Sequence, residues 1–315
     1  MTNIGKDLSL LSAELNAALE LVSEFSGASP VENSEVEYGL ELKGTHSLLE
    51  RCKSVTSTVK DKRKLRVIHH FACSGGTLIS KCISSLPNVF LMSELQPTSL
   101  LHLGDGNPKF SPSDVITQAR YAHVPNMNEL AWKIFINSIE ISNEHVQNLG
   151  GHLVVRSHTH SEFCVGPEIP KNSATIERLK SKFDLINIFT VRNPIDSYLS
   201  LNENGWVHFE PSTFDDYCNR LLACINQFED SQVFKYEDIV SSPETSLREI
   251  ASALDLPFSE SFLDTFSAVK VTGDSGRTSD NISPRERKQI SKDFENEILS
   301  SSAFKKISAL LNYEL

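Results

Sequence analysis

The sequence predicts an α/β fold built on a central, mainly parallel sheet, with additional helices at the N-terminus. Two observations lead to this prediction. From residue 65 onward, short apolar stretches rich in β-branched residues alternate with stretches of helical periodicity, as in repeated strand–helix–strand units. A chain of 315 residues also buries about three quarters of its unfolded surface, so its core needs neither disulfides nor metals for stability.

The α/β part begins with an apolar stretch that ends at a glycine turn, and a helix is expected directly after that turn. Pro194 suits the first turn of a later helix, because proline lacks the amide hydrogen that this position leaves unused. The five predicted strands lie at 65–72, 89–92, 152–156, 185–191 and 232–236. The expected helices lie at 76–86, 112–123, 127–148, from 194 onward and at 243–254, with two more before residue 315.

Residues 1–60 are expected to form a separate helical appendage, and residues 61–315 the α/β domain. Apolar residues at three- and four-residue spacing predict an amphipathic helix over 7–25. Residues 26–37 are polar and acidic and read as a linker, and residues 41–60 are again helical in pattern. The apolar stripe of the first helix suits either packing on the α/β domain or contact with a second copy in a homo-oligomer.

Composition limits the classes of partner. There are 41 acidic residues against 30 Lys and Arg, a formal charge of −11, which argues against nucleic acid and anionic membranes as partners. A single anion pocket remains compatible with this balance. The six cysteines form no CxxC pair and fit neither a zinc ribbon nor a disulfide framework. With no apolar stretch of 18 residues and no signal-like start, we expect reduced thiols and a cytoplasmic protein.

The first candidate site is the turn after the first strand, where Ser74, Gly75, Gly76 and Thr77 follow Cys73. Glycines let successive amide groups point inward, and the following helix N-terminus adds partial positive charge, so the turn suits a phosphate group. The hydroxyls of Ser74 and Thr77 are further donors. The turn lacks the Gly-Lys-Ser/Thr of a Walker A loop. A tight turn without any ligand is the alternative interpretation.

The second candidate follows the fourth strand, where Arg192 stands at the carboxyl end that binds ligands in open α/β sheets. Ser200 lies eight residues later and reaches the same phosphate only if the helix runs beside it. An ordinary helix start is the alternative.

The third candidate closes the third strand, where His158 follows Arg156 and is well placed as a general base. His158 and His160 have no third ligand at a useful spacing, so no metal is predicted. His69 and His70, inside the first strand, are expected to be structural.

Taken together and in this order, these motifs resemble the sulfotransferase family over roughly residues 65–285. The turn at Cys73–Thr77 is similar to the family's phosphosulfate loop, and His158 follows a basic and a hydroxyl residue as the family's catalytic histidine does. The family's 3′-phosphate motif, an Arg-Asn pair with a serine eight positions after the arginine, is matched by Arg192 and Ser200.

Two later features extend the resemblance. Tyr236 begins a Tyr-Glu-Asp run like the one whose tyrosine contacts adenine in the family, and Gly276-Arg277 is similar to a late pair that grips the 3′-phosphate. The resemblance implies a three-layer, P-loop NTPase-like fold and 3′-phosphoadenosine-5′-phosphosulfate (PAPS) as the co-substrate, with no metal. It also implies His158 as the base, Arg156 as the group that stabilises the transferring sulfuryl, and a hydroxyl or amine acceptor whose class the sequence does not indicate.

The sequence departs from the family at two positions. Cys73 replaces the cation that neutralises the departing oxygen, and Leu78 replaces an aromatic residue that stacks on adenine. Arg156 or Lys81 could supply the missing charge, although Lys81, one helical turn beyond Thr77, is expected to reach back poorly. The departure at Cys73 leaves a non-catalytic nucleotide-binding protein as the alternative function, with a P-loop kinase ranked below it because the Walker lysine is missing.

Overall fold

The computed structural model describes residues 62–101, 111, 113–272 and 281–313. The predicted appendage at 1–60, its linker and its suggested role in a homo-oligomer lie outside the described residues, as do Gly276 and Arg277. The proposed domain limits therefore stay predictions.

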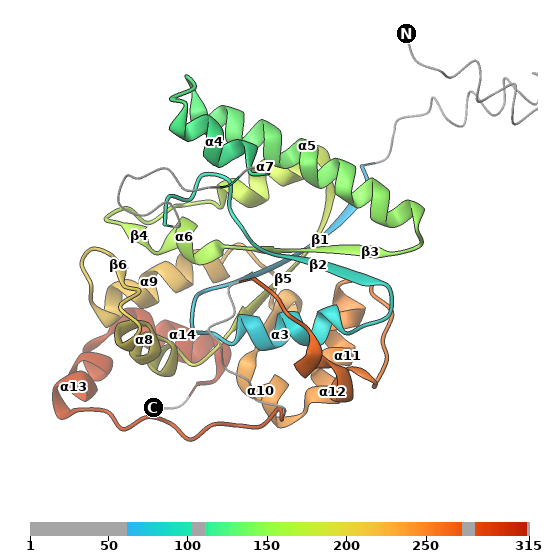
Figure 1. The fold of residues 1–315 in the computed structure, drawn as a ribbon. Coiled ribbons are helices and arrows are strands. Elements are labelled where there is room, and N and C mark those ends of the chain that lie inside the picture. Colours follow the sequence, from blue (N-terminus) through green and yellow to red (C-terminus); the bar gives the residue numbers. More distant parts are fainter. Residues whose placement is uncertain (1–61, 102–110, 112, 273–280, 314–315) are drawn as a thin grey trace, which may run out of the picture. The chain divides into compact units, whose positions relative to one another are not determined.

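A five-stranded parallel sheet forms the centre of the described part, in the order β2-β3-β1-β5-β7 (Figure 1). The predicted α/β fold class is confirmed. All five expected strands are present, and two of them are longer at their carboxyl ends than expected. The strands are β1 (Lys64–His70), β2 (Val89–Leu95), β3 (His152–Ser157), β5 (Asp184–Val191) and β7 (Val233–Lys235).

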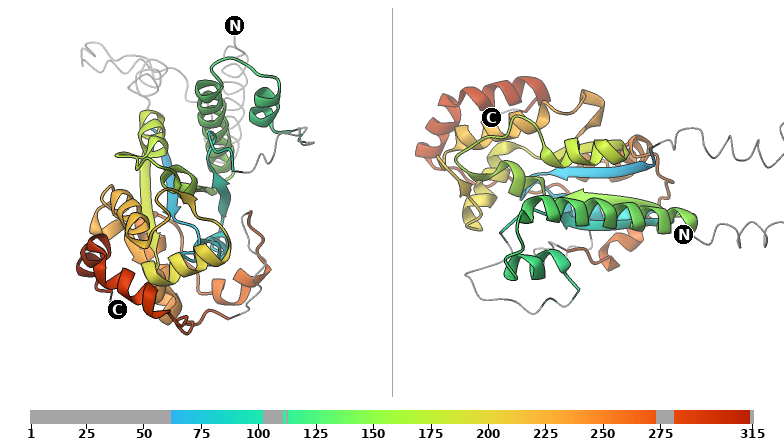
Figure 2. Two further views of the ribbon diagram at one scale, coloured as in Figure 1. Left: turned by 90° about the vertical axis from the view of Figure 1, so that its left-hand side faces the viewer. Right: turned by 90° about the horizontal axis from the view of Figure 1, so that it is seen from above.

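Helices cover both faces of the sheet and give three layers, as Figure 2 also shows. Side chains alternate along β1, because Leu65 and Val67 join the apolar cluster on one face whereas Ile68 joins the cluster on the other. The first face carries α4 (Val115–Tyr121), α5 (Met127–Asn148) and α7 (Ala174–Lys182). The second carries α3 (Gly76–Ser84), α10 (Tyr236–Ser241), α11 (Pro243–Ala253), α12 (Phe262–Thr265) and the 3₁₀ turn η2 (Phe266–Ala268).

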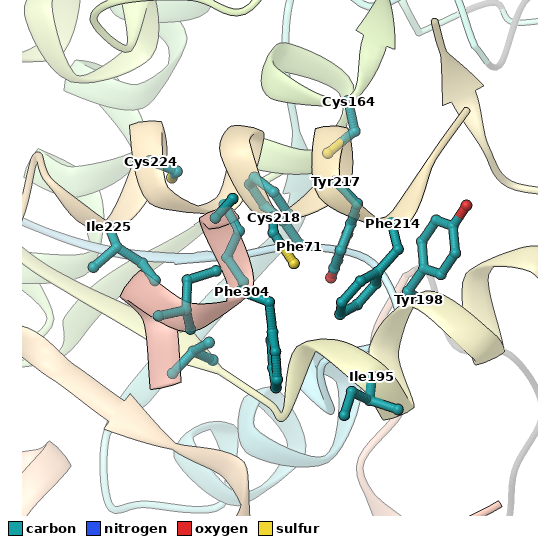
Figure 3. Packing of buried hydrophobic residues seen from close by; sticks show 14 of the residues in the cluster. Phe71, Cys164, Ile195, Tyr198, Phe214, Tyr217, Cys218, Cys224, Ile225 and Phe304 are labelled. Atoms are coloured by element: carbon teal, nitrogen blue, oxygen red, sulfur yellow. The ribbon is translucent and has the colours of Figure 1, made fainter. Parts of the chain in front are cut away.

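A third apolar cluster lies beyond the carboxyl ends of the strands, where Phe71 meets an aromatic group that includes Phe214, Tyr217 and Phe304 (Figure 3). The rings of Phe214 and Phe304 have centroids 5.4 Å apart, so the helix that contains Phe304 packs against the helix that begins at Phe214. The helices that build this cluster are α6 (Thr159–Phe163), α8 (Pro194–Glu203), α9 (Phe214–Ile225), α13 (Lys292–Ser300) and α14 (Ser302–Leu311).

The chain also forms a small second sheet from β4 (Val165–Gly166) and β6 (His208–Phe209). Arg220 of α9 is fully buried beneath it, paired with Asp216 at 2.6 Å. Its guanidinium also donates to the carbonyl oxygens of Phe163 and Gly166. Because its Nη2 also donates to the carbonyl oxygen of Glu210 at 3.4 Å, this arginine connects the segment after α6 with the segment before α9. Because the five main strands are parallel, the loops that follow them all lie along one edge of the sheet.

Candidate active site

A cavity of about 690 Å³ lies at that edge and is lined by residues that follow β1, β2, β3, β5 and β7. Its volume is in the range usual for a small-molecule site. It brings together most of the predicted site residues, although these range from Gly75 to Tyr236 in the sequence. The predicted residues that line it are Gly75, Gly76, Thr77, Arg156, His158, Arg192, Ser200 and Tyr236.

The phosphate loop depends on its two glycines for close packing. Gly75 has a φ of +87°, and a Cβ there would lie 2.2 Å from Cδ2 of Tyr236. A Cβ on Gly76 would lie 2.3 Å from the His70 ring. No side chain caps the N-terminus of α3, whose first amide groups have no acceptor inside the helix. The turn thus presents amide groups to the cavity, as an anion cradle requires.

Ser74 and Thr77, the two hydroxyl residues of this loop, are placed differently. The Ser74 hydroxyl is buried and donates to the carbonyl oxygen of Phe71 at 2.7 Å, and Ser74 does not line the main cavity. Thr77, in the first turn of α3, does line it. Of the two predicted hydroxyl donors, the structure brings Thr77 to the cavity.

Arg192 and Tyr236 lie against each other beside the phosphate loop. The guanidinium of Arg192 is 5.3 Å from the centre of the Tyr236 ring, and its Nη1 donates to the carbonyl oxygen of Cys73 at 3.4 Å. The backbone amide of Asn193 donates to Oε1 of Glu237 at 2.8 Å, which fixes the Arg192 turn to the start of α10. The β5 and β7 motifs therefore form one wall of the cavity.

Arg156 directs its guanidinium hydrogens to protein acceptors. Its Nε donates to Nε2 of His70 at 3.0 Å, and its Nη2 is 2.5 Å from Oε1 of Glu94. Its Nη1 donates to Oγ of Ser93 at 3.0 Å and contacts the carbonyl oxygen of Thr272 at 3.5 Å. A guanidinium has five N–H donors. Arg156 therefore ties β1, β2, β3 and the segment after η2 together, and its charge is shared with Glu94.

His70 has a role that the sequence interpretation did not assign. Because Nε2 of His70 accepts from Arg156, the ring proton lies on Nδ1 and the imidazole is neutral. Burial, with the nearby charge of Arg156, holds the pKa of His70 well below its ordinary value. The same ring packs against Gly76 and lines the cavity. His70 thus connects the phosphate loop with the Arg156 cluster.

Glu94 is the principal site residue that sequence reasoning missed. It has a left-handed φ of +59°, and it lies at the end of β2 where the β2–β3 register shifts. Its Oε2 is 3.8 Å from Nε2 of His158. Burial raises the pKa of Glu94 above its ordinary value, and the charge of Arg156 partly offsets that rise. The residues around it form no motif, so only the order of the strands brings this carboxylate to the site.

Lys81 also lines the cavity, from the second turn of α3, and it is 9 % exposed. The expectation that Lys81 reaches back poorly to the phosphate loop stays a prediction. Cys73, at the position of the family's cation, has a left-handed φ of +66° and lines the cavity too. Its Sγ accepts from Nδ2 of Asn204 at 3.7 Å. Of the described lysines and arginines, Lys81, Arg156, Arg192 and Arg285 line the same cavity as the phosphate loop.

The described residues include no group of three or more His, Cys, Asp or Glu that could hold a metal ion. His160 is buried beside the carbonyl oxygen of Trp206, and burial lowers its pKa to about 3. Among the described helices, none is long and apolar enough to cross a membrane.

The chain resembles known proteins at the level of its fold. No protein-family model matches the sequence, and a search of curated proteins finds no match. Among solved structures, a sulfotransferase domain from the curacin biosynthetic pathway is similar with a TM-score of 0.50 at 17% identity, covering 81% of this chain and 100% of that domain.

Two further solved structures are similar at lower scores. The sulfotransferase domain of the Synechococcus PCC 7002 olefin synthase has a TM-score of 0.45 at 17% identity, over 81% of this chain and 97% of that one. Mouse sulfotransferase SULT7A1 complexed with PAP has a TM-score of 0.37 at 13% identity, over 83% and 93%. The likeness to the curacin-pathway domain shows that the chain has the sulfotransferase fold.

Proposed function

We propose that this protein is a sulfotransferase that moves a sulfuryl group from PAPS to a hydroxyl or amine. The observation that carries the proposal is that one cavity is lined by the phosphate cradle, by Arg192, Ser200 and Tyr236, and by His158 beside Glu94. An anion site next to an acid–base pair is what transfer of an anionic group to a protonated nucleophile requires.

The residues present fit the donor. The amide groups at Gly76 and Thr77 would hold the 5′-phosphosulfate, with Lys81 as the adjacent cation. Arg192 and Ser200 would hold the 3′-phosphate, a role that Gly276 and Arg277 would share. Tyr236 would contact the adenine. When bound, PAPS supplies a sulfuryl group attached to a phosphate leaving group. Close packing of Tyr236 and His70 on the two glycines supports this assignment.

The acceptor must lose a proton as its oxygen or nitrogen bonds to sulfur and the bond from sulfur to the bridging oxygen breaks. His158 is our proposed general base, and Glu94, 3.8 Å away, would stabilise the resulting imidazolium. Arg156 directs its donors to Glu94, His70 and backbone or hydroxyl oxygens, so we assign it to holding Glu94 in place. Arg156 also lines the cavity, so its expected contact with the sulfuryl group stays a prediction.

Cys73 favours a second candidate, a nucleotide-binding protein of this fold without transferase activity. The family's cation at that position acts on the departing oxygen, and removing a charge-assisted donor of this kind costs a factor of about 10² or more in rate. Lys81 in the cavity supports the transferase, because it supplies charge from the neighbouring helix turn.

The scattered cysteines of the sequence also lead us to propose a cytoplasmic location.

The test is transfer of ³⁵S from labelled PAPS to a panel of alcohols, phenols and amines. We expect transfer to at least one acceptor, and a loss of about 10²-fold or more in the His158→Ala variant. Unchanged transfer in that variant would refute the mechanism. Tight binding of the desulfated nucleotide with no transfer to any acceptor, and no gain in the Cys73→Lys variant, would favour the non-catalytic candidate.

A further inference from the structure

Strand β2 contains one extra residue where it passes Arg156. Its register against β3 shifts between Met92 and Leu95, where three steps along β2 span two steps along β3. Ser93 and Glu94 therefore face Arg156 together, as two residues face one in a β-bulge. Both reach the same guanidinium, since Nη1 of Arg156 donates to Oγ of Ser93 at 3.0 Å and Nη2 lies 2.5 Å from Oε1 of Glu94.

The bulge is a strained part of the backbone. Glu94 has a φ of +59°, in the left-handed region that residues other than glycine disfavour. Successive side chains of a regular strand point to opposite faces, so a regular β2 would not bring Ser93 and Glu94 to the same group. A strained residue of this kind persists only where neighbouring contacts hold it. The contacts next to Glu94 therefore determine where its carboxylate points.

Ser93 and Thr272 supply such contacts through their two hydroxyl groups, which we call the hydroxyl pair. Oγ1 of Thr272 donates to the carbonyl oxygen of Ser93 at 2.8 Å, and Oγ of Ser93 donates to the carbonyl oxygen of Thr272 at 3.0 Å. The Ser93 carbonyl belongs to the peptide bond that precedes Glu94. The Thr272 carbonyl oxygen also lies 3.5 Å from Nη1 of Arg156. The segment after η2 is thereby bound to the bulge, although Thr272 lies 179 positions beyond Ser93.

The hydroxyl pair lies outside the cavity. Arg156, Glu94 and His158 line the cavity, whereas Ser93 and Thr272 do not. A change at either hydroxyl therefore acts on the site through the bulge and the guanidinium. This distinguishes the hydroxyl pair from residues that would touch a nucleotide or an acceptor.

We infer that Ser93 and Thr272 are positioning residues, whose hydroxyl pair holds the β2 bulge and Nη1 of Arg156 so that Nη2 stays on Glu94. With Oε1 of Glu94 bound in this way, Oε2 stays 3.8 Å from Nε2 of His158. The effect on the catalytic rate rests on the proposed function, whereas the hold on Arg156 and Glu94 does not.

Four variants of the full chain test the hydroxyl pair. Thr272→Val removes the hydroxyl and keeps the shape of the side chain, and Thr272→Ser keeps the hydroxyl. Ser93→Ala removes the other hydroxyl. Thr265→Val is the matched control, because the exposed Thr265 hydroxyl donates to the carbonyl oxygen of Ser261 at 2.9 Å, within its own helical turn and away from the bulge.

The first measurement needs no turnover. The protein is labelled with ¹⁵N-arginine, and NMR records how fast the Nε–H of Arg156 exchanges with water; the Arg156→Lys variant identifies the signal. This N–H is buried and donates to Nε2 of His70 at 3.0 Å. We expect exchange about two- to tenfold faster in Thr272→Val and Ser93→Ala, the range that the loss of one hydrogen bond gives. Thr272→Ser and Thr265→Val should exchange as the wild type does.

The second measurement is steady-state transfer from labelled PAPS. We expect kcat to fall about two- to tenfold in Thr272→Val and Ser93→Ala, with the KM for PAPS within about twofold of the wild type, because the hydroxyl pair touches no substrate. Thr272→Ser should restore kcat, and Thr265→Val should leave it unchanged.

Wild-type exchange at Arg156 in both Thr272→Val and Ser93→Ala would overturn the inference, as would an equal effect of Thr265→Val. A rise in KM without a fall in kcat would also contradict a positioning role. Faster exchange in Thr272→Val, in a protein that transfers no sulfuryl group, would support the hydroxyl pair and contradict the proposed function. Transfer that depends on His158, with exchange and kcat unchanged in Thr272→Val and Ser93→Ala, would do the reverse.

Discussion

The Gly75→Ala substitution probes the contact on which the phosphate loop and the adenine wall both depend. Gly75 has a φ of +87°, and its new Cβ would lie 2.2 Å from Cδ2 and 2.6 Å from Cε2 of Tyr236. The aromatic ring must therefore move or the loop must shift. Gly150 is a matched control, since its φ is +74° and a Cβ there meets nothing within 4 Å.

Both variants lose stability because alanine is placed in the left-handed region, and only Gly75→Ala also creates a steric overlap. Placing alanine in the left-handed region costs about 1 to 2 kcal/mol at either position. Gly75→Ala adds an overlap with Tyr236, and overpacking of this kind costs about 1 to 3 kcal/mol. We therefore expect a loss in free energy of unfolding of about 1 to 2 kcal/mol for Gly150→Ala and about 2 to 5 kcal/mol for Gly75→Ala. Moving Tyr236 should also weaken nucleotide binding, which Gly150→Ala should leave intact.

Urea denaturation measures the free energy of unfolding of each variant, and calorimetric titration measures its affinity for adenosine 3′,5′-bisphosphate. We expect both losses to be larger for Gly75→Ala than for Gly150→Ala. Equal losses of stability, together with wild-type affinity in Gly75→Ala, would refute the assignment of Tyr236 and Gly75 to a common nucleotide wall.

Three further predictions concern other parts of the molecule. Glu94→Gln should lower the transfer rate by about 10²-fold, because it removes the anion that stabilises the imidazolium form of His158. The affinity for the bisphosphate should change little. Steady-state kinetics with both substrates varied tests this prediction. Arg220→Met should cost about 3 to 5 kcal/mol of unfolding free energy in urea, since it leaves the partly buried carboxylate of Asp216 and the buried carbonyl oxygen of Phe163 without their donor, and a loss below 1 kcal/mol would contradict this role. The lowered pKa of His160, about 3 against 6.5, means that its contribution to stability is present above pH 6.5 and is lost as the pH falls towards 3. The His160→Gln variant should therefore lose less stability on acidification than the wild type, by about 1.4 kcal/mol per pH unit, in urea titrations below pH 6.5.

Much of the fold is readable from local sequence, because buried parallel strands are continuous apolar runs. All five strands of the main sheet follow from such runs. The expected elements do not include α9, although its signal is present. Thr213 accepts from the amide of Asp216 as an N-cap, and Phe214, Tyr217 and Leu221 recur at helical spacing along the buried face.

Some site residues are positioned by their neighbours in the sequence, and others only by the tertiary fold. The phosphate loop and the Arg192 turn carry their geometry in consecutive residues, so their positions at the ends of strands can be predicted. Glu94 reaches the site because β2 pairs with β3, and no feature of its neighbours indicates that pairing. Lys81 reaches the cavity because the cavity extends along α3 beyond the first turn. The Ser74 hydroxyl donates to the carbonyl oxygen of Phe71 in the same loop, and the sequence of the loop does not indicate this hydrogen bond.

The central claim is that the cavity binds a nucleotide with a 3′-phosphate, and a thermal shift of the full chain tests it most directly. A ligand that binds only the native state at about one hundred times its Kd stabilises it by about 2.7 kcal/mol, which corresponds to a rise in Tm of roughly 5 to 10 °C for a domain of this size. We expect adenosine 3′,5′-bisphosphate to produce such a rise and ATP at the same concentration to produce less than half of it. An equal or larger rise with ATP, or none with the bisphosphate, would contradict the account.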